Sequence, residues 1–267
     1  MVVIGGRTTY DCEPTLDDAQ VLEFCKAGYL RLDAVIPEAV GQRAQAFLNA
    51  KAAELEGREI LGHDGPSNVD PVELLGEEWF VDGVLLHPAV AGAVRSLLGP
   101  AFGLPVLIHN HRVVPEQGAS AAQGWHHDGG SQFAVSAGYG STTVPGLNYL
   151  QVFYYPQLVT AEMGPTELVP GSGYFQLPGP PLGSQPLLTT ASAGTVFITD
   201  YPIMHRRAAS SRPCKRDLLK YMYWRTQPPA RDWASTRDSF DFHKADWRSF
   251  YGAGGPMENV EAVSRRT

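Results

Sequence analysis

The chain has 267 residues, enough to bury a full hydrophobic core without disulfides or a structural metal. Apolar residues make up 43% and charged residues 18%, a composition that excludes an intrinsically disordered chain. The net charge is −7 and no basic stripe is present, which argues against a nucleic-acid partner.

The cysteines and the apolar runs indicate the cellular compartment in which the protein is expected. Cys12, Cys25 and Cys214 are widely spaced and form no CxxC pair, so neither a zinc ribbon nor a disulfide framework is indicated. The first residues lack the pattern of a signal peptide, and no apolar run is long enough to cross a bilayer. We therefore expect a cytoplasmic protein with no membrane partner, and nothing in the sequence indicates an oligomeric state.

The first hundred residues carry helical patterns. The segment Thr15-Leu16-Asp17-Asp18 is typical of a helix N-cap, and Gly28 is the expected stop of the helix that follows. Further along, we expect a short strand over 29–32, a second helix from Pro37 to about Leu55, and a third helix over 88–98. These elements form a helical flank over residues 15–100.

From about residue 103 the pattern changes to short apolar or alternating runs separated by Gly, Pro and Ser. Strands are expected over 104–114, 123–128, 147–155, 166–169, 194–200 and 216–225. Helices followed by a series of strands predict a mainly β, jelly-roll-like double sheet with flanking N-terminal helices. We expect one domain over 1–267, with the barrel core at 103–225 and a C-terminal extension at 226–267.

The most informative segment is Gly124-Trp125-His126-His127-Asp128. If this segment is extended, His126 and Asp128 point to one side and His127 to the other. One imidazole and one carboxylate are two of the three ligands in the facial triad that holds Fe(II) and leaves sites open for co-substrate and oxygen. The pattern is weak on its own, because it needs a third ligand on another strand.

His205 is the candidate third ligand. It follows the apolar strand predicted over 194–200 through a Tyr-Pro bend, and Arg216 stands eleven residues further on. If the next strand returns antiparallel, Arg216 points into the same cavity. A guanidinium there binds a carboxylate through two parallel hydrogen bonds, as a dicarboxylate cofactor requires at its far end.

Taken together, these segments resemble the phytanoyl-CoA dioxygenase-like family of Fe(II)/2-oxoglutarate-dependent oxygenases. The family typically carries Trp-His-x-Asp, here residues 125–128, and a segment from Gly-Pro to Pro-Gly-Ser, here residues 164–172. It also carries a distal His followed eleven residues later by Arg, here His205 and Arg216. The resemblance covers roughly residues 15–225, and one departure is Gly173, where the family often has His.

The resemblance implies a fold, a cofactor set and a reaction. The fold is a double-stranded β-helix, a jelly-roll or cupin-like barrel, with iron at one mouth held by His126, Asp128 and His205. 2-Oxoglutarate would bind iron through its keto acid end and Arg216 through its other carboxylate, with O₂ in the remaining site. The implied enzyme is a dioxygenase that releases succinate and CO₂ and hydroxylates a small molecule, for which a secondary metabolite is the candidate. Desaturation, epimerisation and cyclisation are alternative outcomes, whereas the presence of Asp128 disfavours halogenation.

Four further side chains are candidates for cofactor contacts. His109 and His111 share one face of an expected strand, and we expect at least one of them to line the cavity. Gln151, on the strand expected over 147–155, and Thr166 are candidates for polar contacts there. The spacer 129–146 directly follows the proposed ligands and is the candidate substrate lid.

Two other hypotheses fit part of the sequence. A cupin-type metalloenzyme would use His109, His111 and Glu116, but its second motif normally has a His shortly after Pro-x-Gly, and the region of Pro170 lacks it. A non-catalytic binding protein on the same barrel is the second alternative, because fold does not imply function. The retention of all three ligands and of Arg216 argues against it.

Overall fold

The computed structural model describes residues 12–54, 71–99, 102–103, 108–111, 119–128, 149–174, 179–211 and 214–225. The expected lid 129–146, the extension 226–267 and Glu116 lie outside the described residues. Helical elements are α1 (Asp18–Ala27), α2 (Glu38–Glu54), α3 (Pro71–Leu75), α4 (Glu78–Phe80), a π-helix (Val81–Leu85), α5 (Pro88–Leu98) and a 3-10 helix (Ser172–Tyr174). Strands are β1 (Tyr29–Leu32), β2 (Ile108–Asn110), β3 (Tyr149–Tyr155), β4 (Thr166–Leu168), β5 (Leu187–Leu188), β6 (Thr195–Asp200), β7 (His205–Arg207) and β8 (Leu219–Trp224).

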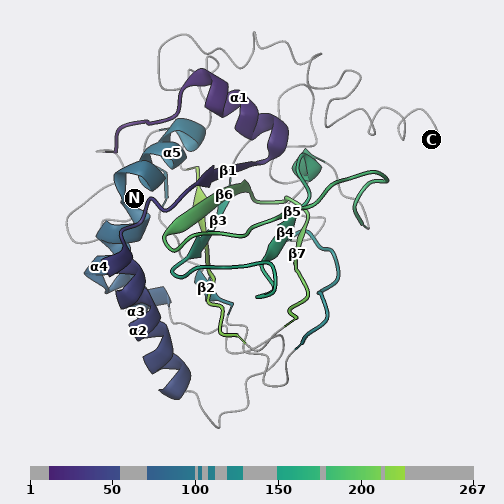
Figure 1. Cartoon of the computed structure of the whole chain (residues 1–267). Helices are drawn as coiled ribbons and strands as arrows, with labels where there is room; N and C mark the ends of the chain where they lie inside the picture. The colour runs from purple at the N-terminus through teal and green to yellow at the C-terminus, as the bar shows by residue number, and fades with distance from the viewer. Residues whose placement is uncertain are drawn as a thin grey trace.

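The strands form two antiparallel sheets. The larger has the order β1-β6-β3-β8-β2, and the smaller has the order β5-β4-β7. In the larger sheet Val152 of β3 lies between Ile198 of β6 and Tyr221 of β8. The helices lie on one side of this sheet, as Figure 1 shows, and the smaller sheet lies on the other. The mainly β architecture with flanking N-terminal helices is as predicted.

Strand β3 is buried on both faces and joins two hydrophobic clusters. Leu150 and Val152 belong to the cluster that includes the helices, whereas Phe153 and Tyr155 belong to the cluster between the sheets. This alternation follows from the period of two in a strand. Each fully buried side chain of this size contributes about 1.5–3 kcal/mol through removal of apolar surface from water.

The first helix begins two residues later than expected. Its N-cap is Asp17, which forms a capping box with Gln20, and not Thr15. The backbone N–H of Thr15 is instead close to the carbonyl oxygen of Gly92 and to the hydroxyl of Ser96 on α5. This contact holds Thr15 outside the helix. The expected stop at Gly28 is confirmed, since this residue has φ +74° and donates to the carbonyl of Phe24.

The helices over 71–85 were not predicted. The segment Trp79–Leu85 is apolar on most sides and is packed against the core, so it lacks the polar face by which periodicity reveals a helix. Among the described residues, no single helix is both long and apolar enough to cross a membrane. Only the pair Glu78–Leu85 and Pro88–Leu98, taken together across a 59° bend, meets both criteria.

We predict that Gly194→Ala destabilises the fold. Gly194 precedes β6 with φ +82°, and an added Cβ would lie 2.1 Å from the carbonyl oxygen of Ile36. The backbone cannot move away freely, because Ile36 donates to the Gly194 carbonyl at 3.1 Å. The free energy of unfolding in chemical denaturation should fall by about 2 kcal/mol or more. Gly179→Ala is the matched control, since nothing lies within 4 Å of its added Cβ. Equal losses in the two variants would contradict this account.

Candidate metal centre

Two segments that are distant in the chain meet beside β7. Residues 119–128 form no regular strand, in contrast to the strand expected over 123–128, but run antiparallel to β7 through isolated bridges. His126 donates its N–H to the carbonyl of His205 at 3.1 Å, and His205 donates back at 2.9 Å. Their ring centroids are consequently 4.5 Å apart. This backbone pairing brings the first and third predicted ligands together.

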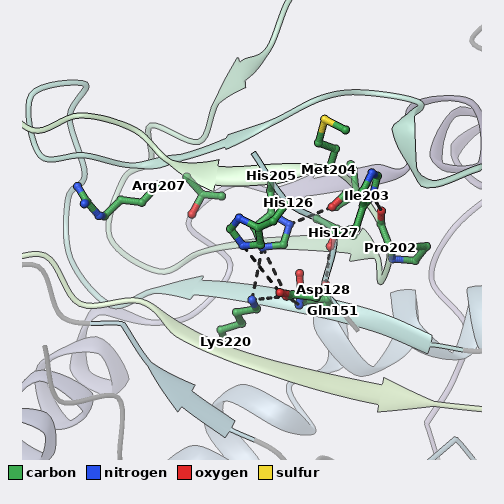
Figure 2. A network of polar contacts seen from close by, with 12 residues as sticks. His126, His127, Asp128, Gln151, Pro202, Ile203, Met204, His205, Arg207 and Lys220 are labelled. Atoms are coloured by element: carbon green, nitrogen blue, oxygen red, sulfur yellow. Dashed lines mark hydrogen bonds and ion pairs between the residues drawn. The ribbon is translucent and has the colours of Figure 1, made fainter. Parts of the chain in front are cut away.

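The three predicted ligands form one cluster, in which every ligand atom lies within 4.8 Å of the others. The carboxylate oxygens of Asp128 lie 3.9 Å from Nε2 of His126 and 3.5 Å from Nε2 of His205. Figure 2 shows both imidazole rings directed toward this carboxylate. His127 points away, as predicted, with its Nδ1 on the carbonyl of Pro202.

Backbone carbonyls fix how the two ligand rings are oriented. Nδ1 of His126 lies 3.0 Å from the carbonyl of Gly124, and Nδ1 of His205 lies 2.9 Å from that of Ile203. Carbonyls accept only, so each Nδ1 carries the proton. Each Nε2 is therefore the nitrogen directed toward the shared centre, which is the arrangement that metal-binding histidines adopt.

The protonation states also suit a metal. His205 is only 4% exposed, and burial lowers its pKa to about 3, so the ring is neutral at pH 7. Burial by itself raises the pKa of the Asp128 carboxyl, but His205 and Lys220 together hold it well below its ordinary value. A neutral imidazole and an ionised carboxylate are the forms that bind metal.

Sequence analysis missed Lys220, which lies beside the cluster. The Lys220 ammonium forms an ion pair with Oδ2 of Asp128 and lies 3.4 Å from Nε2 of His205 (Figure 2). Gln151 donates a hydrogen bond to the same carboxylate oxygen. The signal was present, because Lys220 stands four residues after Arg216 and an extended chain would place both on one face. The regular strand begins at Leu219, later than the predicted 216.

A first cavity of about 420 Å³, partly open to solvent, extends from His126 and His205 to Arg216. Arg216 is 1% exposed, and among the described residues its Nε and Nη1 have no hydrogen-bond partner. Burial lowers the pKa of this guanidinium, yet arginine stays protonated in proteins. Thr166 and His111 line the same cavity. The cavity therefore contains a buried cation with free donors facing two of the three candidate ligands.

A second cavity of about 380 Å³ lies on the other side of Lys220, which lines both. Asp128 and Gln151 face this second cavity, together with His109 and Tyr201. His109 and His111, candidate ligands in the cupin hypothesis, thus line different cavities. The predicted contact residues are divided between the two sides of the metal centre.

Comparison with known proteins was informative only at the level of structure. No protein-family profile matches the sequence, and no curated protein matches it either. Among solved structures, the α-ketoglutarate-dependent carbocyclase SnoK from nogalamycin biosynthesis is 19% identical, with TM-score 0.59, over 87% of this chain and 91% of that chain. The epimerase SnoN from the same biosynthesis is 18% identical, with TM-score 0.57, over 78% and 82%. HygX from Streptomyces hygroscopicus, solved with nickel and 2-oxoglutarate bound, is 16% identical, with TM-score 0.58, over 80% and 88%.

The chain has the fold of these enzymes. The double-stranded β-helix expected from the sequence is therefore confirmed. Identity below 20% shows shared architecture and leaves the chemistry to be argued from the site itself.

We predict that the adjacent residues His126 and His127 differ in their contribution to metal affinity. His126→Ala and Asp128→Ala should each weaken Mn(II) binding, measured by calorimetry on the metal-free protein, by more than about 100-fold, beyond the usual effect of losing an outer contact. His127→Ala should leave it nearly unchanged, since His127 faces Pro202. Retention of metal by Asp128→Ala would instead favour the ligand set His109, His111 and Glu116.

We also predict that the metal-free protein loses stability in acid. Burial lowers the pKa of His111 to about 3, whereas in the unfolded chain it is about 6.5. Between these values the unfolded state binds more protons, so the free energy of unfolding falls as the pH drops below about 6.5. His111→Gln should reduce that slope by about 1.4 kcal/mol per pH unit in denaturation at pH 4–6. An unchanged slope would show that His111 is not buried in its neutral form.

Proposed function

We propose that the protein is an Fe(II)- and 2-oxoglutarate-dependent oxygenase that acts on a small molecule. The observation that carries the proposal is the shared cavity, which His126 and His205 line together with Arg216, whose buried Nε and Nη1 have no partner among the described residues. A metal site alone fits many functions. A metal site with a buried guanidinium in the same cavity fits a dicarboxylate that binds both.

The donor set suits iron. Two imidazoles and one carboxylate from His126, Asp128 and His205 match the facial triad, which leaves coordination positions open. Iron and 2-oxoglutarate, when bound, would supply the oxidising chemistry, with O₂ consumed and succinate and CO₂ released. The role of the chain is to orient these groups, and Gln151 does so by donating to the Asp128 carboxylate.

Arg216 is the proposed clamp for the distal carboxylate of 2-oxoglutarate. Its Nε and Nη1 have no partner among the described residues, so the guanidinium still has donors to give to a carboxylate. His111 borders this space with a buried Nε2 that also lacks a partner among the described residues, and Thr166 borders it from β4. We assign both to contacts with the cofactor, whereas His109 and Gln151 lie on the other side of Lys220.

Within this class of enzymes, we place the chain beside the phytanoyl-CoA dioxygenase-like oxygenases. The support comes from the three segments at 125–128, 164–172 and 205–216. Hydroxylation is the proposed outcome, and the similarity to an epimerase and a carbocyclase makes these two reactions the alternatives to examine. The retained Asp128 argues against halogenation. No disulfide joins Cys12, Cys25 and Cys214, which lie in the described part of the chain, in keeping with a cytoplasmic enzyme.

We predict that Arg216 controls affinity for 2-oxoglutarate and not for metal. The protein should develop a weak visible charge-transfer band when Fe(II) and 2-oxoglutarate are added without oxygen, and should form succinate when O₂ is admitted. Arg216→Met should raise the 2-oxoglutarate concentration needed for the band by about 30-fold or more, the effect of losing a buried, hydrogen-bonded charge partner. Fe(II) affinity should stay within about twofold, since Arg216 is not a ligand.

Arg43→Met is the matched control, because it removes the same charge from an exposed position on α2. It should leave both affinities unchanged. If neither the band nor 2-oxoglutarate binding can be detected, the non-catalytic binding protein becomes the better hypothesis. Equal losses of 2-oxoglutarate and Fe(II) affinity in Arg216→Met would argue against the clamp.

A further inference from the structure

Lys220 is a buried cation whose counter-charge is a metal ligand. Its side chain is 12% exposed and projects from β8 to the Asp128 carboxylate (Figure 2). The ammonium also lies 5.9 Å from the centroid of the Phe153 ring, so its surroundings are partly apolar. In the metal-free protein the ion pair with Asp128 balances this charge. The balance is lost when Asp128 serves as a ligand to a metal dication.

A cation in this position cannot reach bulk water easily. Removing one partner from a largely buried ion pair is strongly unfavourable, because the remaining charge stays desolvated. A long lysine side chain can turn, but within the described part of the chain Lys220 lines the two cavities that flank the metal centre. Its new partner must therefore be an anion inside one of them.

A count of the charges around the centre shows that 2-oxoglutarate alone does not neutralise them. Arg216, Lys220 and a metal dication together carry four positive charges. Asp128 and the two carboxylates of 2-oxoglutarate carry three negative charges, which leaves one positive charge uncompensated. The other charged pair at the first cavity, Arg206 and Glu167, is balanced within itself. Arg207 also lines the first cavity and lowers the pKa of Arg216, whereas the Asp217 carboxylate raises it, so these two further charges offset one another.

The second cavity is the place for the missing anion. It is lined by Lys220, Asp128, Gln151, Tyr201, Met222 and His109. Burial lowers the pKa of His109, so Lys220 is the cation among these lining residues at neutral pH. The first cavity is assigned to 2-oxoglutarate through Arg216. Tyr201 and Met222 add apolar surface on which the body of an organic molecule can pack.

We propose that the prime substrate is a small organic molecule with a carboxylate, which Lys220 binds in the second cavity. The inference rests on the proposed function and deepens it by naming the substrate class. A carboxylate fits better than a phosphate, because one charge needs compensation and a phosphate monoester carries nearly two. Lys220 is thus a specificity-determining residue that holds the substrate beside the metal centre.

The test uses the protein loaded with Mn(II) and 2-oxoglutarate, which does not turn over. The probes are benzoate, cyclohexanecarboxylate and propionate, each paired with its uncharged primary amide. Binding is followed by the paramagnetic relaxation that Mn(II) causes in probe protons, a readout that requires proximity to the metal and no activity. We expect at least one carboxylate to bind about tenfold or more tightly than its amide, as one charged hydrogen bond would give.

Three variants assign that preference to Lys220. Lys220→Met should abolish the carboxylate preference, and Lys220→Arg should retain most of it. Lys215→Met removes the same charge at an exposed site near Asn49 of α2 and should leave the preference unchanged. Circular dichroism and Mn(II) affinity of each variant, measured in parallel, show that the fold and the metal site persist.

Four results would overturn the proposal. Equal binding of carboxylates and amides to the loaded protein would remove its basis, and so would a carboxylate preference that survives in Lys220→Met. A fall in 2-oxoglutarate affinity in Lys220→Met as large as the fall in probe affinity would assign the ammonium to the cofactor. Failure of Mn(II) or 2-oxoglutarate to bind the wild-type protein would instead refute the proposed function, and this inference with it.

Discussion

The pairing of the His126 and His205 backbones is the interaction on which the candidate site depends. Two reciprocal hydrogen bonds hold a segment without regular strand structure against β7. Because both ligands belong to paired, extended backbone, their imidazoles are positioned by the sheet. Asp128, two residues after His126, then points to the same side by the ordinary alternation of an extended chain. The geometry of all three ligands therefore follows from one local contact between chain segments.

The larger sheet supplies the groups that face this contact. Gln151 of β3 and Lys220 of β8 project from its inner face toward Asp128, and Phe153 of β3 is the register partner of Lys220. The outer face of the same strands packs against the helices, which holds the inner face in place. A rigid strand with one face in the core and one in the site is a better support for ligands than a loop would be. The helical flank therefore supports the site indirectly, because it packs against β3 and β8 and holds them in place.

Much of this arrangement could be predicted from the sequence, and the features that could not be predicted have physical explanations. His126 and Asp128 followed from the alternation of an extended segment. His205 and Arg216 were candidates from their places around two expected strands, and the resemblance to a family supported them, because spacing alone cannot show which distant segments meet. Lys220 was missed because a lysine in an alternating strand is usually exposed. The helices over 71–85 were missed because burial on most sides removes the periodicity that signals a helix. The N-cap was misplaced because Thr15 bonds to α5, a tertiary contact that no local pattern encodes.

The ion pair of Lys220 with Asp128 explains how this site can be built before a metal arrives. A buried carboxylate without a partner would cost several kcal/mol, a large share of the stability of a domain. The ammonium and the Gln151 amide remove that cost in the metal-free protein. We therefore expect folding not to depend on metal, in contrast to small zinc domains, which are unfolded without it. On the proposed function, a metal bound by Asp128 would draw on the counter-charge of this lysine, whose ammonium would then be available to a molecule that enters beside the metal. One residue thus links the stability of the metal-free fold to the choice of substrate.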